Sequence, residues 1–346
     1  MILRVLLVLS LLAAIAAASL GGWVQRVLAE PLPLTRPELI EVPPGATLRG
    51  TLAELSARGL VRSPRVLEYY GRATGTAARF QAGEYELTPG LSSRDLLEML
   101  ANGRVHRRRF VLVEGWRMSE VRAALALAPR LVQRLPMLDD AQLMAALHRP
   151  GVPAEGRFFP DTYDYTAGDT DVALLERALA RMEEVLEEEW RSRLGGLPLE
   201  DPDDALVLAS LVEKETGVPE DRERIAGVFT RRLERGMRLQ TDPSVIYGLG
   251  GTFDGNLRRA DLRDPHPWNT YVHRGLPPTP IAMPGRASIR AALRPAEGDA
   301  LYFVARGDGT SEFSATLEAH NEAVRRFQLE RRAPDYRSAP ATRPKR

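Results

Sequence analysis

Residues 205–216 read Ala-Leu-Val-Leu-Ala-Ser-Leu-Val-Glu-Lys-Glu-Thr. The residues before Glu213 are apolar or small, so a helix here would be hydrophobic on nearly all sides and therefore buried. The last turn then carries three ionisable side chains. Gly217 suits a left-handed C-cap, and Pro219 can begin a new helix but cannot continue the old one. We expect a buried central helix that ends in charge.

The two glutamates at this helix end are expected to meet different neighbours. At about 100° per helical residue, Glu215 lies about 200° round the helix from Glu213. The two carboxylates cannot share one cleft, so an acid catalyst here would act largely alone. Apolar walls would raise its pKa and keep it protonated near neutral pH. The plain alternative is a buried helix whose last turn only reaches solvent.

Composition sets the class of protein. The chain has 346 residues, 27% of them charged and 44% hydrophobic, which suits a globular protein of two domains. The formal net charge is +1, so we expect no nucleic-acid partner. Cysteine is absent, which excludes disulfides and thiolate metal sites. The order of predicted elements, given below, indicates an α+β fold.

The N-terminus predicts a membrane segment. An uninterrupted apolar run covers residues 5–20 and extends through a glycine pair to Val24, with Arg4 before it. About 20 apolar residues span a bilayer, whereas the core of a signal peptide usually has 7 to 15. We therefore favour a retained single-pass anchor over residues 1–24, rather than a cleaved signal. Residues 25–38 contain several prolines and are predicted to be an extended linker.

Two folded regions are expected to follow. A small α+β unit over residues 39–107 is predicted to have strands at 39–42 and 83–87 and helices at 48–58, 64–71 and 92–102. A larger mixed unit covers residues 108–330. Its predicted strands are 110–113, 300–305 and 312–314. One helix is expected to start at 119 and a helical stretch to end near 148. Further helices are predicted over 171–194, 219–235 and 316–328. Residues 331–346 are expected to be disordered.

The segment between residues 240 and 284 is rich in turns and in groups that bind sugars. It contains Gln240, Thr241, Asp242, Tyr247 and the Trp-Asn-Thr-Tyr run at 268–271. Prolines at 277, 278, 280 and 284 would fix the loop before a ligand arrives, which lowers the entropy cost of binding. Amides, carboxylates and aromatic faces suit hydroxylated and N-acetylated rings. A rigid structural loop with core aromatics explains the composition equally well.

Several chemistries have no support. The sequence has no phosphate-binding loop of the Gly-Lys-Ser/Thr kind and no His-Glu-x-x-His zinc helix. Its five histidines lack ligand spacing, and His320, next to Asn321, fits packing or hydrogen bonding better than a role as a base. Lys214 is the one lysine of the folded region, and little supports a pyridoxal Schiff base there. We predict no cofactor and no metal.

Several motifs follow one another along the chain in the same order as in a known protein family. They are Leu-Val-Glu-Lys-Glu-Thr at 211–216, Gly-Met-Arg-Leu-Gln-Thr-Asp-Pro at 236–243, Val-Ile-Tyr-Gly at 245–248, Asn-Thr-Tyr at 269–271, Gly-Leu-Pro-Pro at 275–278 and Tyr-Phe-Val at 302–304. Residues 155–163 add Glu-Gly-x-x-x-Pro-Asp-Thr-Tyr. Over about residues 38–328 the chain resembles the endolytic murein transglycosylases, the MltG or YceG-like family. Trp268 and Thr279 depart from the family pattern, which leaves details of the sugar subsites open.

The resemblance implies an architecture, a place in the cell and a reaction. Members are single-pass proteins of the cell inner membrane, with a LysM-like subdomain and a catalytic domain on the periplasmic side. They cleave the β-1,4 bond between N-acetylmuramic acid and N-acetylglucosamine within peptidoglycan strands and leave 1,6-anhydro ends. Cell-wall synthases, the penicillin-binding proteins, are possible partners by the same resemblance.

By this resemblance Glu213, the first glutamate of the motif, is the catalytic residue. It would protonate the leaving oxygen and then accept the proton of the muramyl C6 hydroxyl. Glu215 would support the site or bind substrate, as would Gln240, Thr241, Asp242, Tyr247, Asn269 and Tyr271. Two alternatives remain: a hydrolytic muramidase that uses a base such as Asp242, and a non-catalytic glycan-binding scaffold.

Overall fold

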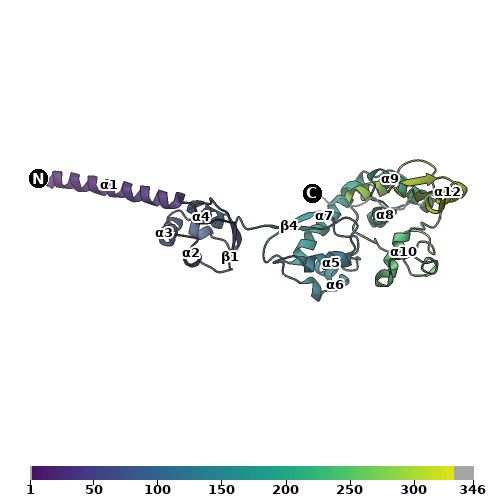
Figure 1. The fold of residues 1–346 in the computed structure, drawn as a ribbon, viewed down its shortest axis with the longest axis horizontal. Helices are drawn as coiled ribbons and strands as arrows, with labels where there is room; N and C mark the ends of the chain where they lie inside the picture. The colour runs from purple at the N-terminus through teal and green to yellow at the C-terminus, as the bar shows by residue number, and fades with distance from the viewer. Residues whose placement is uncertain (1, 331–346) are drawn as a thin grey trace. The chain divides into compact units, whose positions relative to one another are not determined.

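The computed structural model describes residues 2–330, and the tail expected to be disordered, 331–346, lies outside them. The chain forms two compact units, Met1–Arg108 with Asp164–Gly168, and Arg109–Tyr163 with Asp169–Arg346. Both mix helices with short two-stranded sheets (Figure 1). The molecule is therefore of mixed α+β type, with an apolar helix at its N-terminus. The LysM-like assignment of residues 39–107 stays a prediction.

Helix α1 (Ile2–Ala29) is longer than expected. Residues Leu3–Ala29 are long and apolar enough to cross a membrane, a property that signal sequences share. The predicted linker over residues 25–38 is wrong at its start, because the helix continues to Ala29. Val27 and Leu28 are buried in the core of the first unit, as is Leu32. Apolar side chains at the end of the helix thus tie it to the fold.

The first unit packs three helices against an antiparallel strand pair. Strand β1 (Glu38–Val42) pairs with β2 (Gly83–Leu87), with Ile40 opposite Tyr85. The helices are α2 (Leu48–Ala57), α3 (Pro64–Ala73) and α4 (Ser93–Ala101), with a 3₁₀ turn η1 (Thr76–Arg79) after α3. Ser92 caps α4 in a capping box with Asp95, as its sequence position indicates.

Short elements make up the next part of the chain. They are β3 (Arg108–Val111), α5 (Met118–Ala126), the 3₁₀ turn η2 (Leu135–Met137), α6 (Asp140–Ala146) and β4 (Thr162–Tyr165), which pairs with β3. Helix α7 (Asp171–Arg191) follows and buries Leu175, Leu179, Met182 and Leu186 at helical spacing. Met182 and Leu186 join the same core as the central helix.

Helix α8 (Pro202–Glu215) is the predicted central helix, and Ala205 through Val212 are all buried. It packs against α7, α9 (Pro219–Glu234) and α11 (Arg286–Leu293), and Figure 1 shows α8 beside α9. The predicted left-handed cap at Gly217 is wrong. The helix ends because Thr216 is extended, with φ −145°, and its side chain accepts a hydrogen bond from the backbone N–H of Val218.

The C-terminal third places loops and a last helix near the end of α8. It comprises α10 (Asp242–Leu249), the 3₁₀ turns η3 (Gly250–Thr252) and η4 (Asp261–Arg263), and the antiparallel pair β5 (Tyr302–Ala305) and β6 (Ser311–Ser314). Helix α12 (Leu317–Val324) ends earlier than predicted, because the chain continues as a π-helix, η5 (Arg325–Glu330).

Candidate active site

The two glutamates at the end of α8 lie in different surroundings. The Oε2 atom of Glu213 accepts hydrogen bonds from the Gly285 backbone N–H at 3.0 Å and from the Ser288 hydroxyl at 2.7 Å. Glu215 instead accepts a hydrogen bond from the Thr241 hydroxyl. The predicted separation of the two carboxylates is thus confirmed, because each bonds to a different segment of the chain.

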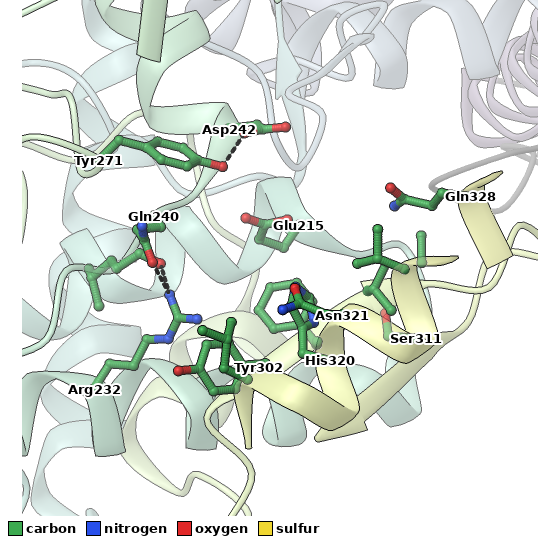
Figure 2. Close-up of a pocket in the computed structure, with 16 residues that line it drawn as sticks. Glu215, Arg232, Gln240, Asp242, Tyr271, Tyr302, Ser311, His320, Asn321 and Gln328 are labelled. Carbon is green, nitrogen blue, oxygen red and sulfur yellow. Dashed lines mark hydrogen bonds between the residues drawn. The ribbon is translucent and has the colours of Figure 1, made fainter. Parts of the chain in front are cut away.

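Glu215 lines a pocket of about 590 Å³, within the size range of ligand sites. Four residues proposed from the sequence line it together: Glu215, Gln240, Asp242 and Tyr271. Figure 2 shows the Glu215 side chain between Tyr271 and Asp242 on one side and residues of α12 on the other. Glu213 is not among the lining residues.

Glu215 keeps its proton to a higher pH than an ordinary glutamate does. Burial, together with the nearby charge of Asp242, raises its pKa to about 7, although the Thr241 hydrogen bond and Arg232 act in the opposite direction. A carboxyl group with this pKa is partly protonated at neutral pH. It can therefore donate a proton and then accept one.

Asp242 is the second carboxylate of the pocket. It occupies the first turn of α10, where the helix dipole favours a negative charge. The Tyr271 hydroxyl donates a hydrogen bond to its Oδ1 at 2.6 Å. Burial and the adjacent Asp242 raise the pKa of Tyr271, so the phenol keeps its proton and remains a donor. Tyr271 thus fixes the Asp242 carboxylate beside Glu215.

Gln240 has a strained backbone at the edge of this pocket. Its φ is +52°, a left-handed value that only two other non-glycine residues adopt among those described. Its N–H donates to the Thr270 carbonyl at 3.1 Å, and its side-chain oxygen accepts from Arg232 at 3.5 Å. Backbone strain of this kind is concentrated at functional sites.

The other residues expected to bind substrate contact protein groups and do not line this pocket. Thr241 is 1% exposed, and its hydroxyl donates a hydrogen bond to Glu215. Asn269 is fully buried, and its side-chain amide donates to the carbonyls of Asp261 and Asp264. Tyr247 packs edge-on against Trp268 with ring centroids 5.5 Å apart. None of Thr241, Asn269 and Tyr247 is among the residues that line the pocket.

A second buried glutamate was not proposed from the sequence. Both carboxylate oxygens of Glu155 accept from the Met118 backbone N–H, at 3.0 and 3.2 Å. Burial raises the pKa of Glu155 to about 7, against the lowering effect of the Met118 N–H and of a hydrogen bond with Tyr247. The start of the Glu-Gly-x-x-x-Pro-Asp-Thr-Tyr segment thereby anchors the N-terminus of α5.

Sequence reasoning also missed several lining residues. Arg232 follows Ile225 and Phe229 at helical spacing on α9 and is 7% exposed. A charged residue on the buried face of a predicted helix could therefore have marked it as a site residue. Its guanidinium donates to the carbonyls of Leu301 and Leu239 at 2.7 and 2.8 Å. Tyr302, Ser311, His320, Asn321 and Gln328 line the pocket from the β5–α12 region, far along the chain from α8.

The site has the chemistry of a proton-transfer centre. It combines one carboxyl group with a raised pKa, a second carboxyl group in the same pocket, and amide and phenol donors that can bind a polar ligand. Within residues 2–330, no three His, Asp or Glu side chains gather as a metal site would require.

Comparison with known proteins gives consistent matches. The model of the YceG-like family matches residues 40–326. An endolytic murein transglycosylase of Bacillus subtilis is 31% identical, over 83% of this chain and 84% of that protein. One from Streptococcus pneumoniae is 27% identical, over 92% of this chain and 64% of that protein. A crystal structure of a YceG-like protein from Listeria monocytogenes superposes with a TM-score of 0.56 at 27% identity, over 84% of this chain and 99% of that one.

Proposed function

Because the chain belongs to the YceG-like family, it is a peptidoglycan transglycosylase of the lyase type, and we propose that it cleaves the MurNAc–GlcNAc β-1,4 bond within glycan strands. The product would carry a 1,6-anhydroMurNAc end. The observation that supports this best is one partly protonated glutamate, Glu215, in a pocket lined by polar side chains. A reaction of this type needs only one such group.

Glu215 takes the role that the sequence motif suggested for Glu213. The side chain of Glu213 is only 7% exposed, and its carboxylate is bonded to Gly285 and Ser288, with the guanidinium of Arg222 3.9 Å away. A proton donor must reach the substrate within hydrogen-bond distance. Glu215 lines the pocket and Glu213 does not, so we assign acid–base chemistry to Glu215 and a positioning role to Glu213.

The proposed reaction has two proton transfers. Protonated Glu215 donates to the glycosidic oxygen as the bond from that oxygen to C1 of MurNAc breaks. The Glu215 carboxylate then takes the proton of the C6 hydroxyl as O6 bonds to C1. The carboxyl is regenerated and water is not consumed. In this proposal Asp242 would stabilise the positive charge that develops at C1, and Gln240 and Tyr271 would orient the sugar.

Asp242 also keeps a muramidase-type hydrolase as the second candidate. An inverting glycosidase needs an acid and a base across the scissile bond, and Glu215 and Asp242 line the same pocket. In that case Asp242 would activate a water molecule. Its hydrogen bond from Tyr271 occupies one of the two oxygens that could accept a proton from water, which favours the single-glutamate reaction.

Isotope labelling separates the two reactions. Uncross-linked glycan strands are incubated in H₂¹⁸O with the full-length protein in detergent, and the new ends are analysed by mass spectrometry. The lytic reaction yields anhydro ends without ¹⁸O, whereas hydrolysis yields reducing ends that contain it. Intact strands together with retained binding would instead support a glycan-binding scaffold.

The same proposal includes a location. Helix α1 would act as a single-pass anchor of the cell inner membrane, with both units on the periplasmic side. From there the enzyme could cut nascent strands and end their elongation. Cell-wall synthases are the proposed partners because they produce those strands.

A further inference from the structure

The pocket around Glu215 has two unlike walls. The catalytic wall carries its charged groups: Glu215, Arg232 and Asp242, with Gln240 and Tyr271. The opposite side, which we call the α12 wall, comes from β5, β6, α12 and η5 and bears no acidic or basic side chain other than His320. Its residues are Tyr302, Phe303, Val304, Ala305, Ser311, Leu317, His320, Asn321, Val324 and Gln328. This wall therefore suits an uncharged polar ligand group.

His320 is held as a neutral ring in this wall. Its imidazole stacks on Tyr302 with centroids 5.2 Å apart and planes 26° apart, and the Arg232 guanidinium lies over the same tyrosine, 5.1 Å from the ring centroid. Burial and the charge of Arg232 lower the pKa of His320. At neutral pH the ring thus has one donor and one acceptor nitrogen.

The hydrogen-bonding capacity of His320 is not used within the described residues. Its Nδ1 is buried without a partner, while its Nε2 is not among the buried orphan atoms. No bond within residues 2–330 fixes the tautomer, so Nε2 can donate or accept as a ligand requires. Because Nε2 has no partner there either, it is the ring nitrogen that is open to a ligand.

Asn321 adds an amide beside this ring. Its side chain is exposed, lines the same pocket, and forms no hydrogen bond to the part of the chain that the structure describes. Figure 2 shows Asn321 and His320 close together on α12, across from Gln240 and Tyr271. A carboxamide offers both a donor and an acceptor. Val324 and Leu317, on the same helix, supply apolar contacts within the pocket.

We propose that His320 and Asn321 form a subsite that binds the acetamido group of the sugar next to the one that reacts. An acetamido group has one N–H, one carbonyl and one methyl, which matches the polar pair and the adjacent apolar side chains. A lactyl carboxylate would find no cation on this wall. The inference rests on the proposed function, because it assumes a glycan strand in the pocket. Both residues act in substrate specificity, whereas Glu215 acts in the chemistry.

The test compares binding to glycans with and without the acetyl group. The full-length Glu215→Gln protein in detergent is the parent, so that strands are bound and not cut. Affinity is measured for uncross-linked strands, for the same strands after de-N-acetylation, and for strands chemically re-acetylated as the treatment control. Asn321→Ala and the double variant His320→Ala/Asn321→Ala are compared with Asn256→Ala, whose exposed side chain lies outside the pocket.

Two lost hydrogen bonds should weaken binding of N-acetylated strands by the double variant about tenfold. The same variant should bind de-N-acetylated strands as well as the parent does, because the contact is then already lost. Asn321→Ala alone removes an exposed side chain and should show a smaller effect with the same selectivity. Asn256→Ala should change neither affinity.

Equal weakening of both strand types by the α12 variants would overturn this inference and leave the proposed function intact. No effect of Asn321→Ala and the double variant on either strand type would overturn it too. If the parent binds neither strand type, the proposed function fails and this inference fails with it.

Discussion

Glu215 and Glu213 show how two identical side chains, two positions apart, come to lie in different surroundings. Glu215 accepts a hydrogen bond from Thr241 and lines the pocket, and its pKa is raised to about 7. Glu213 is surrounded by donors from Gly285, Ser288 and Arg222. The difference depends on segments far along the chain, so the motif alone could not predict these surroundings. Helical spacing could predict only that the two side chains diverge.

The raised pKa of Glu215 predicts a pH-dependent difference in stability. A carboxyl whose folded pKa is about 7, against about 4.5 unfolded, stabilises the fold below pH 4.5, and this contribution is lost as pH rises through 7. Glu215→Gln cannot ionise, so its melting temperature relative to wild type should increase from pH 4.5 to pH 8. Glu155 titrates in both proteins and cancels in the comparison. A difference that stays constant with pH would contradict the assigned pKa.

The strained backbone of Gln240 predicts opposite effects on stability and activity. Glycine adopts φ +52° without the steric cost that glutamine bears. Gln240→Gly should therefore unfold at the same or a higher temperature than wild type, and its kcat/KM should fall about tenfold or more because the amide is lost. Calorimetry and a cleavage assay measure the two quantities. Full activity would remove Gln240 from the site.

The sequence predicts the existence of the helices better than the residues at which they end, and better than the residues that line the site. The periodic apolar residues of α7 and α9 and the capping serine of α4 depend on neighbours a few positions away. The end of α8 was mispredicted because Thr216, not Gly217, terminates it. The α12 wall could not be predicted, because tertiary contacts bring residues 302–328 to Glu215.

The contact between α8 and α11 predicts a structural role for Glu213. Its carboxylate accepts from the N-cap residue Gly285 and from Ser288 in the first turn of α11. Glu213→Gln removes the charge and weakens both bonds, which should reduce the free energy of unfolding by about 1–3 kcal/mol. Ser288→Ala is the matched change on the other partner, and the two effects should be less than additive. Additive losses in denaturant titrations would show that the residues do not interact.

For the whole molecule, the apolar N-terminal helix and the first unit are one structure. Leu28 is fully buried in that unit's core although it belongs to α1. Truncation before residue 30 would therefore remove core side chains as well as the proposed anchor. The apolar helix thus continues into the folded unit, whereas a linker was expected over residues 25–38.

Substitution within α1 can separate anchoring from folding. Leu28→Ala should destabilise the first unit by about 2–5 kcal/mol, whereas Leu12→Ala, at an exposed position of the same helix, should not. Proteolysis at increasing urea concentration in detergent compares the two variants. Equal resistance would show that Leu28 does not stabilise the fold. Both variants should remain in the membrane fraction, since one alanine leaves the helix apolar.

The assignment of the reaction to Glu215 is tested by the ends of the glycan products. Wild type, Glu215→Gln and Glu213→Gln are incubated with uncross-linked strands at a temperature where all three are folded, and anhydromuramyl ends are counted by mass spectrometry. Loss of the general acid should lower the rate for Glu215→Gln about 100- to 10,000-fold, while Glu213→Gln keeps measurable activity. The reverse result, an active Glu215→Gln and an inactive but folded Glu213→Gln, would contradict the assignment.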